Sequence, residues 1–129
     1  CRTLSEAVVD FSLCTIDIFR RHMNIDLTAM SDYVRGHRSC GVASLAICRV
    51  AQGDLSMYMS ARVYPWDYAA ASIILHEMQG AYCMLDRPSS LTKVTAPDQV
   101  TFLAAENIRL IEDLKLLMDK KLLGLDQVN

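Results

Sequence analysis

Residues 64–74 read YPWDYAAASII, and this stretch decides the fold because it places a carboxylate in the first turn of an apolar, alanine-rich helix. Pro65 suits the first helical position, where the missing N–H group of proline has no partner to lose. Asp67 then lies in the turn whose free amides and dipole favour an anion, by about 0.3–1 kcal/mol. The stretch predicts a buried helix over 65–79, with Trp66 mostly buried near its start and its indole N–H paired.

Four further segments surround this helix in a fixed order. They read GHRSCGVASLA at 36–46, VAQGDLSMY at 50–58, HEMQGAY at 76–82 and LAAEN at 103–107. Together with the tryptophan–aspartate pair, this succession resembles the C-terminal half of the inositol monophosphatase family. The resemblance implies an α/β fold and a magnesium-dependent phosphomonoesterase that acts on a small phosphorylated substrate.

The resemblance also implies roles for particular residues. It makes Asp67 a magnesium ligand that also meets the substrate, and it makes the backbone amides of Gly41, Val42 and Ala43 substrate donors. A plainer reading is that Asp67 only stabilises its helix and Gly41 only permits a tight turn. Ser60 stands where the animal inositol enzymes carry a glutamate that binds inositol hydroxyls, and it offers one short uncharged hydrogen bond. The substrate therefore stays open among an inositol phosphate, a sugar bisphosphate and a nucleotide 3′-phosphate.

The family also carries an acidic cluster in its N-terminal half, and nothing in this chain resembles it. One carboxylate is too little to hold magnesium tightly, because the ion requires six oxygen ligands. We therefore expect the chain, which begins at Cys1, to be the C-terminal half of a longer enzyme and to be inactive without its N-terminal half. No catalytic residue is assigned within it. A non-catalytic α/β interaction module is the alternative from a different class.

Composition limits the other possibilities. A chain of 129 residues is one domain by length, and a net charge of −2 argues against a nucleic-acid binder. No apolar run approaches the roughly 20 residues that cross a bilayer, which argues against a membrane protein. The five cysteines include no Cys-x-x-Cys pair, which favours a reducing, cytoplasmic compartment. The 52% share of apolar residues predicts an exposed apolar patch and a homo-oligomer.

Alternation and turn residues predict an α/β layered sheet with flanking helices. We expect strands at 7–11, 33–37, 55–59, 81–85 and 100–105, and helices at 15–21, 41–52, 65–79 and from 107 onward. The stretch from Leu85 to Gln99 reads as irregular. In the last helix one face is apolar and predicts packing onto the sheet rather than a coiled coil; that face holds Ile108, Ile111, Leu114, Leu117 and Met118.

Overall fold

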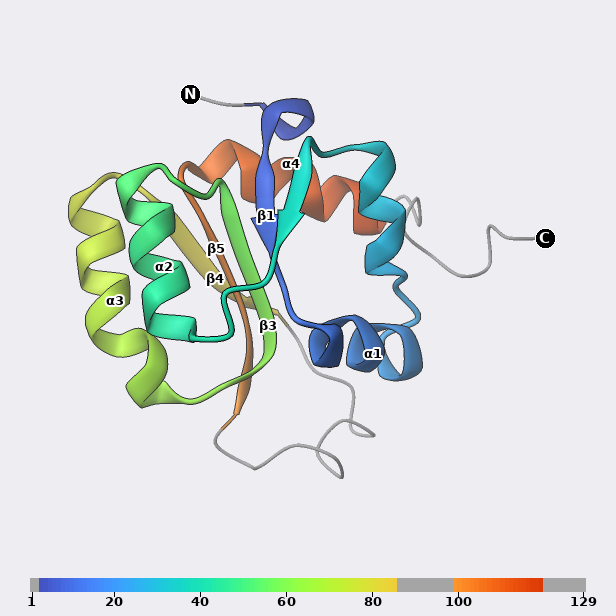
Figure 1. Cartoon of the computed structure of the whole chain (residues 1–129), viewed down its shortest axis with the longest axis horizontal. Helices are drawn as coiled ribbons and strands as arrows, with labels where there is room; N and C mark the ends of the chain where they lie inside the picture. The colour runs from blue at the N-terminus through green and yellow to red at the C-terminus, as the bar shows by residue number, and fades with distance from the viewer. Residues whose placement is uncertain (1–2, 86–98, 120–129) are drawn as a thin grey trace.

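A five-stranded sheet with helices on both faces forms the body of the protein (Figure 1). The structure is a computed structural model that describes residues 3–85 and 99–119. The predicted α/β class is confirmed. The elements, in chain order, are η1 (Leu4–Glu6), β1 (Val8–Asp10), α1 (Leu13–His22), η2 (Leu27–Asp32), β2 (Gly36–Arg38), α2 (Ala43–Gln52), β3 (Met57–Val63), α3 (Pro65–Glu77), β4 (Ala81–Leu85), β5 (Val100–Ala105) and α4 (Ile108–Asp119).

The sheet has the strand order β2-β1-β3-β5-β4 and mixes two pairing modes. β1 is parallel to β2 and to β3, with Val9 opposite both His37 and Met57. β5 runs antiparallel between β3 and β4. Because β1, β2 and β3 point the same way, their carboxyl ends meet at one edge of the sheet, where ligands bind in open α/β sheets.

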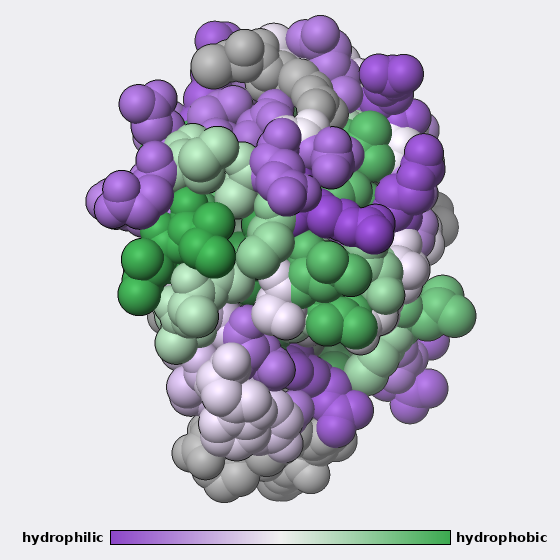
Figure 2. All heavy atoms as spheres, turned by 60° about the vertical axis from the view of Figure 1, so that its left-hand side comes forward, coloured by the Kyte–Doolittle hydropathy of each residue, from purple (hydrophilic) through white to green (hydrophobic). Residues whose placement is uncertain are grey.

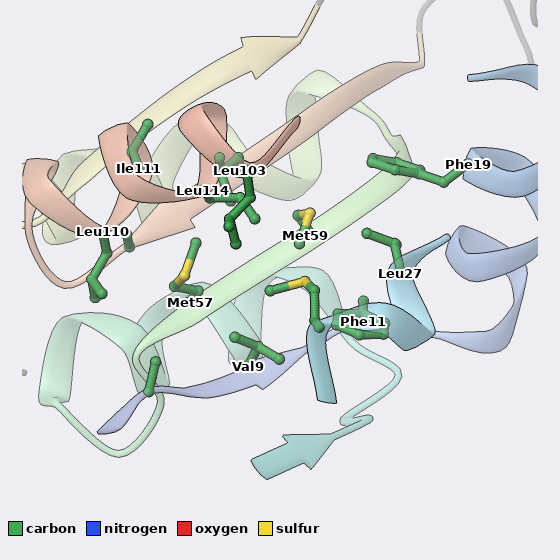
Figure 3. Packing of buried hydrophobic residues seen from close by; sticks show 14 of the residues in the cluster. Val9, Phe11, Phe19, Leu27, Met57, Met59, Leu103, Leu110, Ile111 and Leu114 are labelled. Carbon is green, nitrogen blue, oxygen red and sulfur yellow. The ribbon is translucent and has the colours of Figure 1, made fainter. Parts of the chain in front are cut away.

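Side chains alternate across the strands and feed two separate apolar clusters. Met57 and Met59 of β3 pack on one face of the sheet with α1, η2 and α4 (Figure 3). Tyr58 between them points to the other face and packs with α2 and α3. This period of two is the geometry of a pleated strand. The protein is therefore a three-layer α/β/α arrangement with a core on each side of the sheet.

Two strands begin later than predicted, because the turn before each of them is longer than expected. The chain is still turning at Val34, whose N–H donates to the Met30 carbonyl at 3.0 Å, so β2 begins at Gly36 instead of residue 33. Leu55 likewise donates to the Arg49 carbonyl at 3.2 Å, so β3 begins only at Met57. The 3₁₀ helices η1 and η2 were not predicted. Within the stretch expected to be irregular, residues 86–98 lie outside the part of the chain that the structure describes.

Two glycines near helix ends act in different ways. Gly53 has φ +87° and ends α2 in the left-handed conformation, as predicted. The prediction that Gly80 does the same after α3 is wrong, because Gln79 takes the left-handed φ of 65°. Gly80 is needed for space instead. A Cβ atom there would lie 2.8 Å from the Leu75 Cγ and 3.0 Å from the Ala105 carbonyl oxygen.

The prediction that α3 is a buried helix is wrong. It touches the core through Ala71, Ser72 and Leu75, while Ile73 is 66% exposed. Trp66, expected to be mostly buried, is 70% exposed and stacks on Tyr64 with ring centroids 4.4 Å apart. At 100° per residue, Trp66 points about 140° away from Ala71 and so cannot face the sheet.

The last helix packs onto the sheet as predicted, with one exception on its apolar face. α4 buries Leu110, Ile111, Leu114 and Leu117 against the sheet. Ile108, which was expected on that face, is 58% exposed because it is the first residue of the helix. Asn107 caps the helix, since its Oδ1 accepts from the Leu110 N–H at 3.0 Å.

Among residues 3–85 and 99–119, no helix combines the length and the apolar character that crossing a membrane requires. In the same ranges four cysteines are free thiols: Cys14, Cys40, Cys48 and Cys83.

Candidate functional site

One pocket lies at the carboxyl ends of the parallel strands, between the start of α2 and the start of α3. Its volume is about 450 Å³, which suits a small molecule. All five residues that the sequence singles out line this pocket, namely Gly41, Val42, Ala43, Ser60 and Asp67. They come from the turn after β2, from β3 and from the first turn of α3. The fold therefore brings together residues that are far apart in the chain.

The turn from β2 into α2 supplies backbone donors. Gly41 has φ +81°, a conformation in which any other residue is strained, and no atom lies within 4 Å of where its Cβ would be. Glycine is thus required by the backbone angle and not by a close contact. Val42 is the N-cap of α2 and makes no side-chain capping bond. Within the described residues nothing accepts from the N–H groups of Gly41, Val42 or Ala43, so these amides are available to a ligand oxygen.

Asp67 is the third residue of α3 and is half-buried. Its Oδ2 accepts from the Tyr64 N–H at 3.1 Å, while its own N–H donates to the Tyr64 carbonyl at 2.9 Å. This reciprocal pair fixes the start of the helix, as in a capping box. No described residue donates to Oδ1. Capping and ligand binding are therefore compatible, because they use different oxygens of one carboxylate.

The described residues offer few ligands to magnesium. No group of three His, Cys, Asp or Glu side chains that could hold a metal ion occurs among residues 3–85 and 99–119. Magnesium requires octahedral oxygen coordination and is commonly held by one or two carboxylates together with waters and substrate phosphate. The Oδ1 of Asp67 fits the role of one contributed ligand, and the described residues alone do not complete a site.

Asp10 is a pocket residue that sequence reasoning missed. It ends β1, is only 2% exposed, and its Oδ2 accepts from the Cys40 N–H at 2.8 Å. The carboxylate therefore holds the residue that precedes Gly41. Hydrogen bonding to Asp10, followed by burial, raises the pKa of the Cys40 thiol. The signal in the sequence was a charge at the end of the apolar run AVVD, which is too common a pattern to single out a site.

Tyr58 of β3 also lines the pocket. Burial is the largest cause that raises the pKa of Tyr58 to about 12, and a hydrogen bond with Ser60 opposes the rise. The negative charges of Asp10 and Asp67 raise this pKa further. The phenol therefore stays neutral, and able to donate, over the whole physiological pH range.

Arg62 brings a positive charge to the same wall. It lies on β3 where the register shifts between Ser60 and Val63, and its N–H donates to the Ser60 Oγ at 3.2 Å. Its NH1 lies 3.6 Å from the Cys14 Sγ of α1. Among the described residues that line the pocket, Arg62 is the only basic one. Sequence reasoning missed it because an arginine in a strand is ordinarily a solvated side chain.

Curated relatives match this chain over part of their length. The inositol-1-monophosphatase of Bacillus subtilis is 34% identical over 83 residues, which are 64% of this chain and 31% of that protein. The fructose-1,6-bisphosphatase/inositol-1-monophosphatase of Aquifex aeolicus is 31% identical over 80 residues, which are 60% of this chain and 30% of that protein. The chain spans less than a third of the length of either relative.

Solved structures resemble the fold over most of the chain. The inositol monophosphate complex of a staphylococcal inositol monophosphatase II aligns with a TM-score of 0.66 and 25% identity, covering 88% of this chain and 42% of that one. A Thermotoga maritima inositol monophosphatase has a TM-score of 0.60 at 23% identity, covers 86% of this chain and 39% of that one, and supports the fold alone. A sequence profile of the inositol monophosphatase family matches residues 11–116, and the chain therefore belongs to that family.

Proposed function

We propose that this chain forms the C-terminal half of a magnesium-dependent phosphatase that hydrolyses a phosphate monoester of inositol or of a related small molecule. The observation that carries the proposal is the meeting of Gly41, Val42, Ala43, Ser60 and Asp67 around one pocket. In this proposal the missing N-terminal half supplies the other metal ligands. The complete protein works in the cytoplasm as a homo-oligomer.

Each group of the pocket has a task in this proposal. The N–H groups of Gly41, Val42 and Ala43 donate to oxygens of the substrate, and the Ser60 hydroxyl meets the alcohol. The Oδ1 of Asp67 is a magnesium ligand while Oδ2 keeps its bond to the Tyr64 amide. When bound, magnesium neutralises charge on the phosphate and makes an attacking water more acidic. The neutral Tyr58 and the buried Asp10 hold the shape and polarity of the wall.

The isolated chain is expected to be inactive for a physical reason. One carboxylate oxygen does not compete with the water shell of magnesium, which the ion gives up reluctantly. Without the ion, the chain lacks the group that in this proposal makes the attacking water more acidic and neutralises most of the phosphate charge. The 129-residue chain should therefore neither retain magnesium at ordinary concentrations nor release phosphate from its esters.

A non-catalytic interaction module is the second candidate. It is favoured by the bond between Asp67 and the Tyr64 amide, which gives the carboxylate a structural task without any metal. The exposed apolar side chains of α3, such as Ile73, would then be a binding surface. The two candidates differ in the sequence that precedes this chain in the full-length protein, because an acidic cluster there is required only by the phosphatase.

Replacing Asp67 by asparagine in the full-length protein tests the proposal. Asparagine keeps the helix start but removes a charged ligand oxygen, so turnover of inositol 1-phosphate should fall by more than about 100-fold. Magnesium affinity, measured by calorimetry, should fall as well. The free energy of unfolding should drop by no more than about 1 kcal/mol, because only the helix-dipole term is lost.

Asp54→Asn is the matched control. Asp54 is an exposed carboxylate between α2 and β3, at the end of the strand that lies away from the pocket. Its loss should leave turnover and magnesium affinity unchanged. Full activity in Asp67→Asn, or phosphatase activity in the 129-residue chain alone, would refute the assignment of Asp67 and favour a site elsewhere.

A further inference from the structure

A second pocket lies between η2 and the strands β1 and β2, and we call it the η2 pocket. Its volume is about 310 Å³, at the lower end of the range for small-molecule sites. It shares no lining residue with the pocket that contains Asp67. The two are nevertheless back to back, because Phe11 lines the η2 pocket while its chain neighbour Asp10 lines the other one. The proposed hydrolysis gives the η2 pocket no task.

The floor of the η2 pocket is apolar and belongs to the core. Val9, Leu27 and Met30 line it, and each of them is only 1% exposed. Figure 3 shows Val9, Phe11 and Leu27 among the side chains of the larger apolar cluster. Covering such a floor with an apolar group is favourable, because it removes apolar surface from water. The floor therefore suits a hydrocarbon chain or a ring.

An aromatic wall stands beside this floor. The rings of Phe11 and His37 lie with their centroids 4.5 Å apart. The His37 Nε2 lies 2.8 Å from the Phe11 carbonyl oxygen, and because a carbonyl only accepts, Nε2 carries the proton and donates. This bond fixes the imidazole and occupies its N–H group. His37 therefore offers a ligand mainly the flat surface of its ring.

The rim of the η2 pocket is polar and carries one permanent charge. Thr28, Ser31 and Arg35 are the exposed residues there, and none of the described residues that line the pocket is an aspartate or a glutamate. The Thr28 hydroxyl already donates to the Asp26 Oδ1. Within residues 3–85 and 99–119, no carboxylate forms a salt bridge with Arg35. The guanidinium therefore keeps its N–H donors available beside an apolar floor.

The backbone of Arg35 is held in place before any ligand binds. Its N–H donates to the Ala7 carbonyl at 2.8 Å, and the Gly36 N–H donates to the same oxygen at 3.3 Å. Val34, the residue before it, donates to the Met30 carbonyl at 3.0 Å. The Arg35 side chain therefore projects from a fixed point at the rim. A fixed donor reduces the ordering entropy that binding must overcome.

Floor and rim together select a molecule with an apolar end and one anionic end. A bare anion would leave the apolar floor uncovered, and a plain hydrocarbon would leave Arg35 without a partner. A guanidinium presents paired N–H groups that match the two oxygens of a carboxylate. A phosphate dianion carries more charge than the single arginine neutralises. The volume of about 310 Å³ leaves room for one ring and a short chain.

We propose that the η2 pocket is a binding site for a small apolar carboxylic acid. The apolar part of the acid lies on the floor formed by Val9, Leu27 and Met30, and its carboxylate pairs with Arg35 at the rim. This site is distinct from the pocket that contains Asp67, and the proposal does not depend on the phosphatase function.

Three matched probes test the two halves of the site by calorimetry on the full-length protein. 3-Phenylpropionate has both the ring and the carboxylate, 3-phenylpropanamide lacks the charge, and propionate lacks the ring. The acid should bind with a dissociation constant below about 1 mM, and the amide about tenfold more weakly, because it loses a charge-assisted hydrogen-bond pair. Propionate should give no measurable binding. Equal affinity for acid and amide, or no binding of the acid up to about 10 mM, would overturn the proposal.

Substitutions of Arg35 test the anionic end. Arg35→Ala should weaken binding of 3-phenylpropionate by about tenfold and leave the affinity for the amide unchanged. Arg35→Lys, which keeps the charge but not the fork, should give an intermediate affinity. Arg109→Ala is the matched control, because Arg109 is an exposed arginine of α4 that does not line the η2 pocket. The same affinity for the acid in the native protein and in Arg35→Ala would refute the role of Arg35 and with it the site.

A larger side chain in the η2 pocket tests the apolar end. Val34 lines the pocket and is half-buried, so Val34→Phe should reduce the volume and weaken binding of both the acid and the amide. 3-Phenylpropionate should raise the melting temperature of the native protein and of Arg109→Ala, but not that of Val34→Phe. Since Arg35 is exposed, Arg35→Ala keeps the fold, and the test stands even if Val34→Phe does not fold.

Competition locates the acid. Inorganic phosphate should not displace 3-phenylpropionate, and Asp67→Asn should bind it as the native protein does, because Asp67 lines the other pocket. Displacement by phosphate, or loss of binding in Asp67→Asn, would place the acid in that other pocket and overturn the proposal. None of these measurements needs turnover. Failure of the η2 site and failure of the phosphatase function are therefore distinguishable.

Discussion

The two faces of the sheet are covered by helices of different kinds. On one face α4 is amphipathic, burying Leu110 and Leu114 while Glu112 and Lys115 stay exposed. On the other face α3 is apolar nearly all round, burying Leu75 and exposing Ile73. Figure 2 shows apolar side chains at the surface on this side of the molecule. A helix that is apolar all round is normally buried on every side. The difference indicates that α4 is complete with the packing seen here, whereas α3 is suited to a second partner.

The two faces also differ in where they carry polar groups. The pocket opens at the carboxyl ends of β1 and β3, where the starts of α1, α2 and α3 meet, and Tyr58 of β3 packs within the α2 and α3 cluster. The α1 and α4 face holds a larger cluster that is almost wholly apolar, including Phe19, Met57 and Leu103 (Figure 3). Residues of both layers line the pocket, because Cys14 and Thr15 of α1 and Met59 of the larger cluster also belong to its wall.

The largest expected effect on stability comes from the face of α4. Leu114 is fully buried in the larger cluster, so Leu114→Ala should lower the free energy of unfolding by about 2–5 kcal/mol. Leu116→Ala is the control on the same helix, where the side chain is 51% exposed and the change should stay within about 0.5 kcal/mol. Urea denaturation measures both. Equal effects of the two substitutions would show that α4 does not pack as described.

A smaller effect, dependent on pH, is expected from Tyr58. Its pKa is raised above the unfolded value of 10, to about 12, so the folded state favours the neutral phenol. This stabilisation is complete below pH 10, where both states are protonated, and it is lost as the pH rises from 10 to 12. The loss should amount to about 1–2 kcal/mol, which allows for the partial access of solvent to the hydroxyl.

Tyr58→Phe isolates this contribution, since lysine and cysteine side chains also titrate at high pH. The difference in unfolding free energy between the native protein and Tyr58→Phe should be constant up to pH 10 and should change only above it. A difference that does not change between pH 9 and pH 12 would mean that the phenol is open to solvent.

The sequence specified regular elements better than it specified the site. β4 and β5 begin and end at the predicted residues, 81–85 and 100–105. Gly41, Ser60 and Asp67 were identified because the segments that contain them resemble the inositol monophosphatase family. Asp10 and Arg62 were missed because a strand-end charge acquires meaning only when the sheet brings β1 and β3 side by side.

The misplacement of Trp66 has a different origin. Its size and its position in an apolar helix favoured burial, yet the side of a helix that meets a sheet is set by the whole set of contacts. Ala71 and Leu75 fix that side, and Trp66 falls outside it. A helix with apolar residues all round has no pattern from which the buried side can be read.

The smallest expected change in stability, with a large change in assembly, concerns the outer side of α3. Ile73 is 66% exposed, so Ile73→Glu should alter the free energy of unfolding by no more than about 0.5 kcal/mol. If α3 packs against α3 of a second copy, Ile73→Glu introduces two charges into an apolar interface, because a two-fold interface contains each residue once from each copy. Sedimentation should then show dimers of the native protein and a dissociation constant raised by about tenfold or more in Ile73→Glu.

Leu13→Glu on α1, where the side chain is 82% exposed, is the control and should leave the dimer intact. A native protein that stays monomeric at high concentration would mean that α3 is not a contact between copies, and the difference between the two faces would then need another explanation.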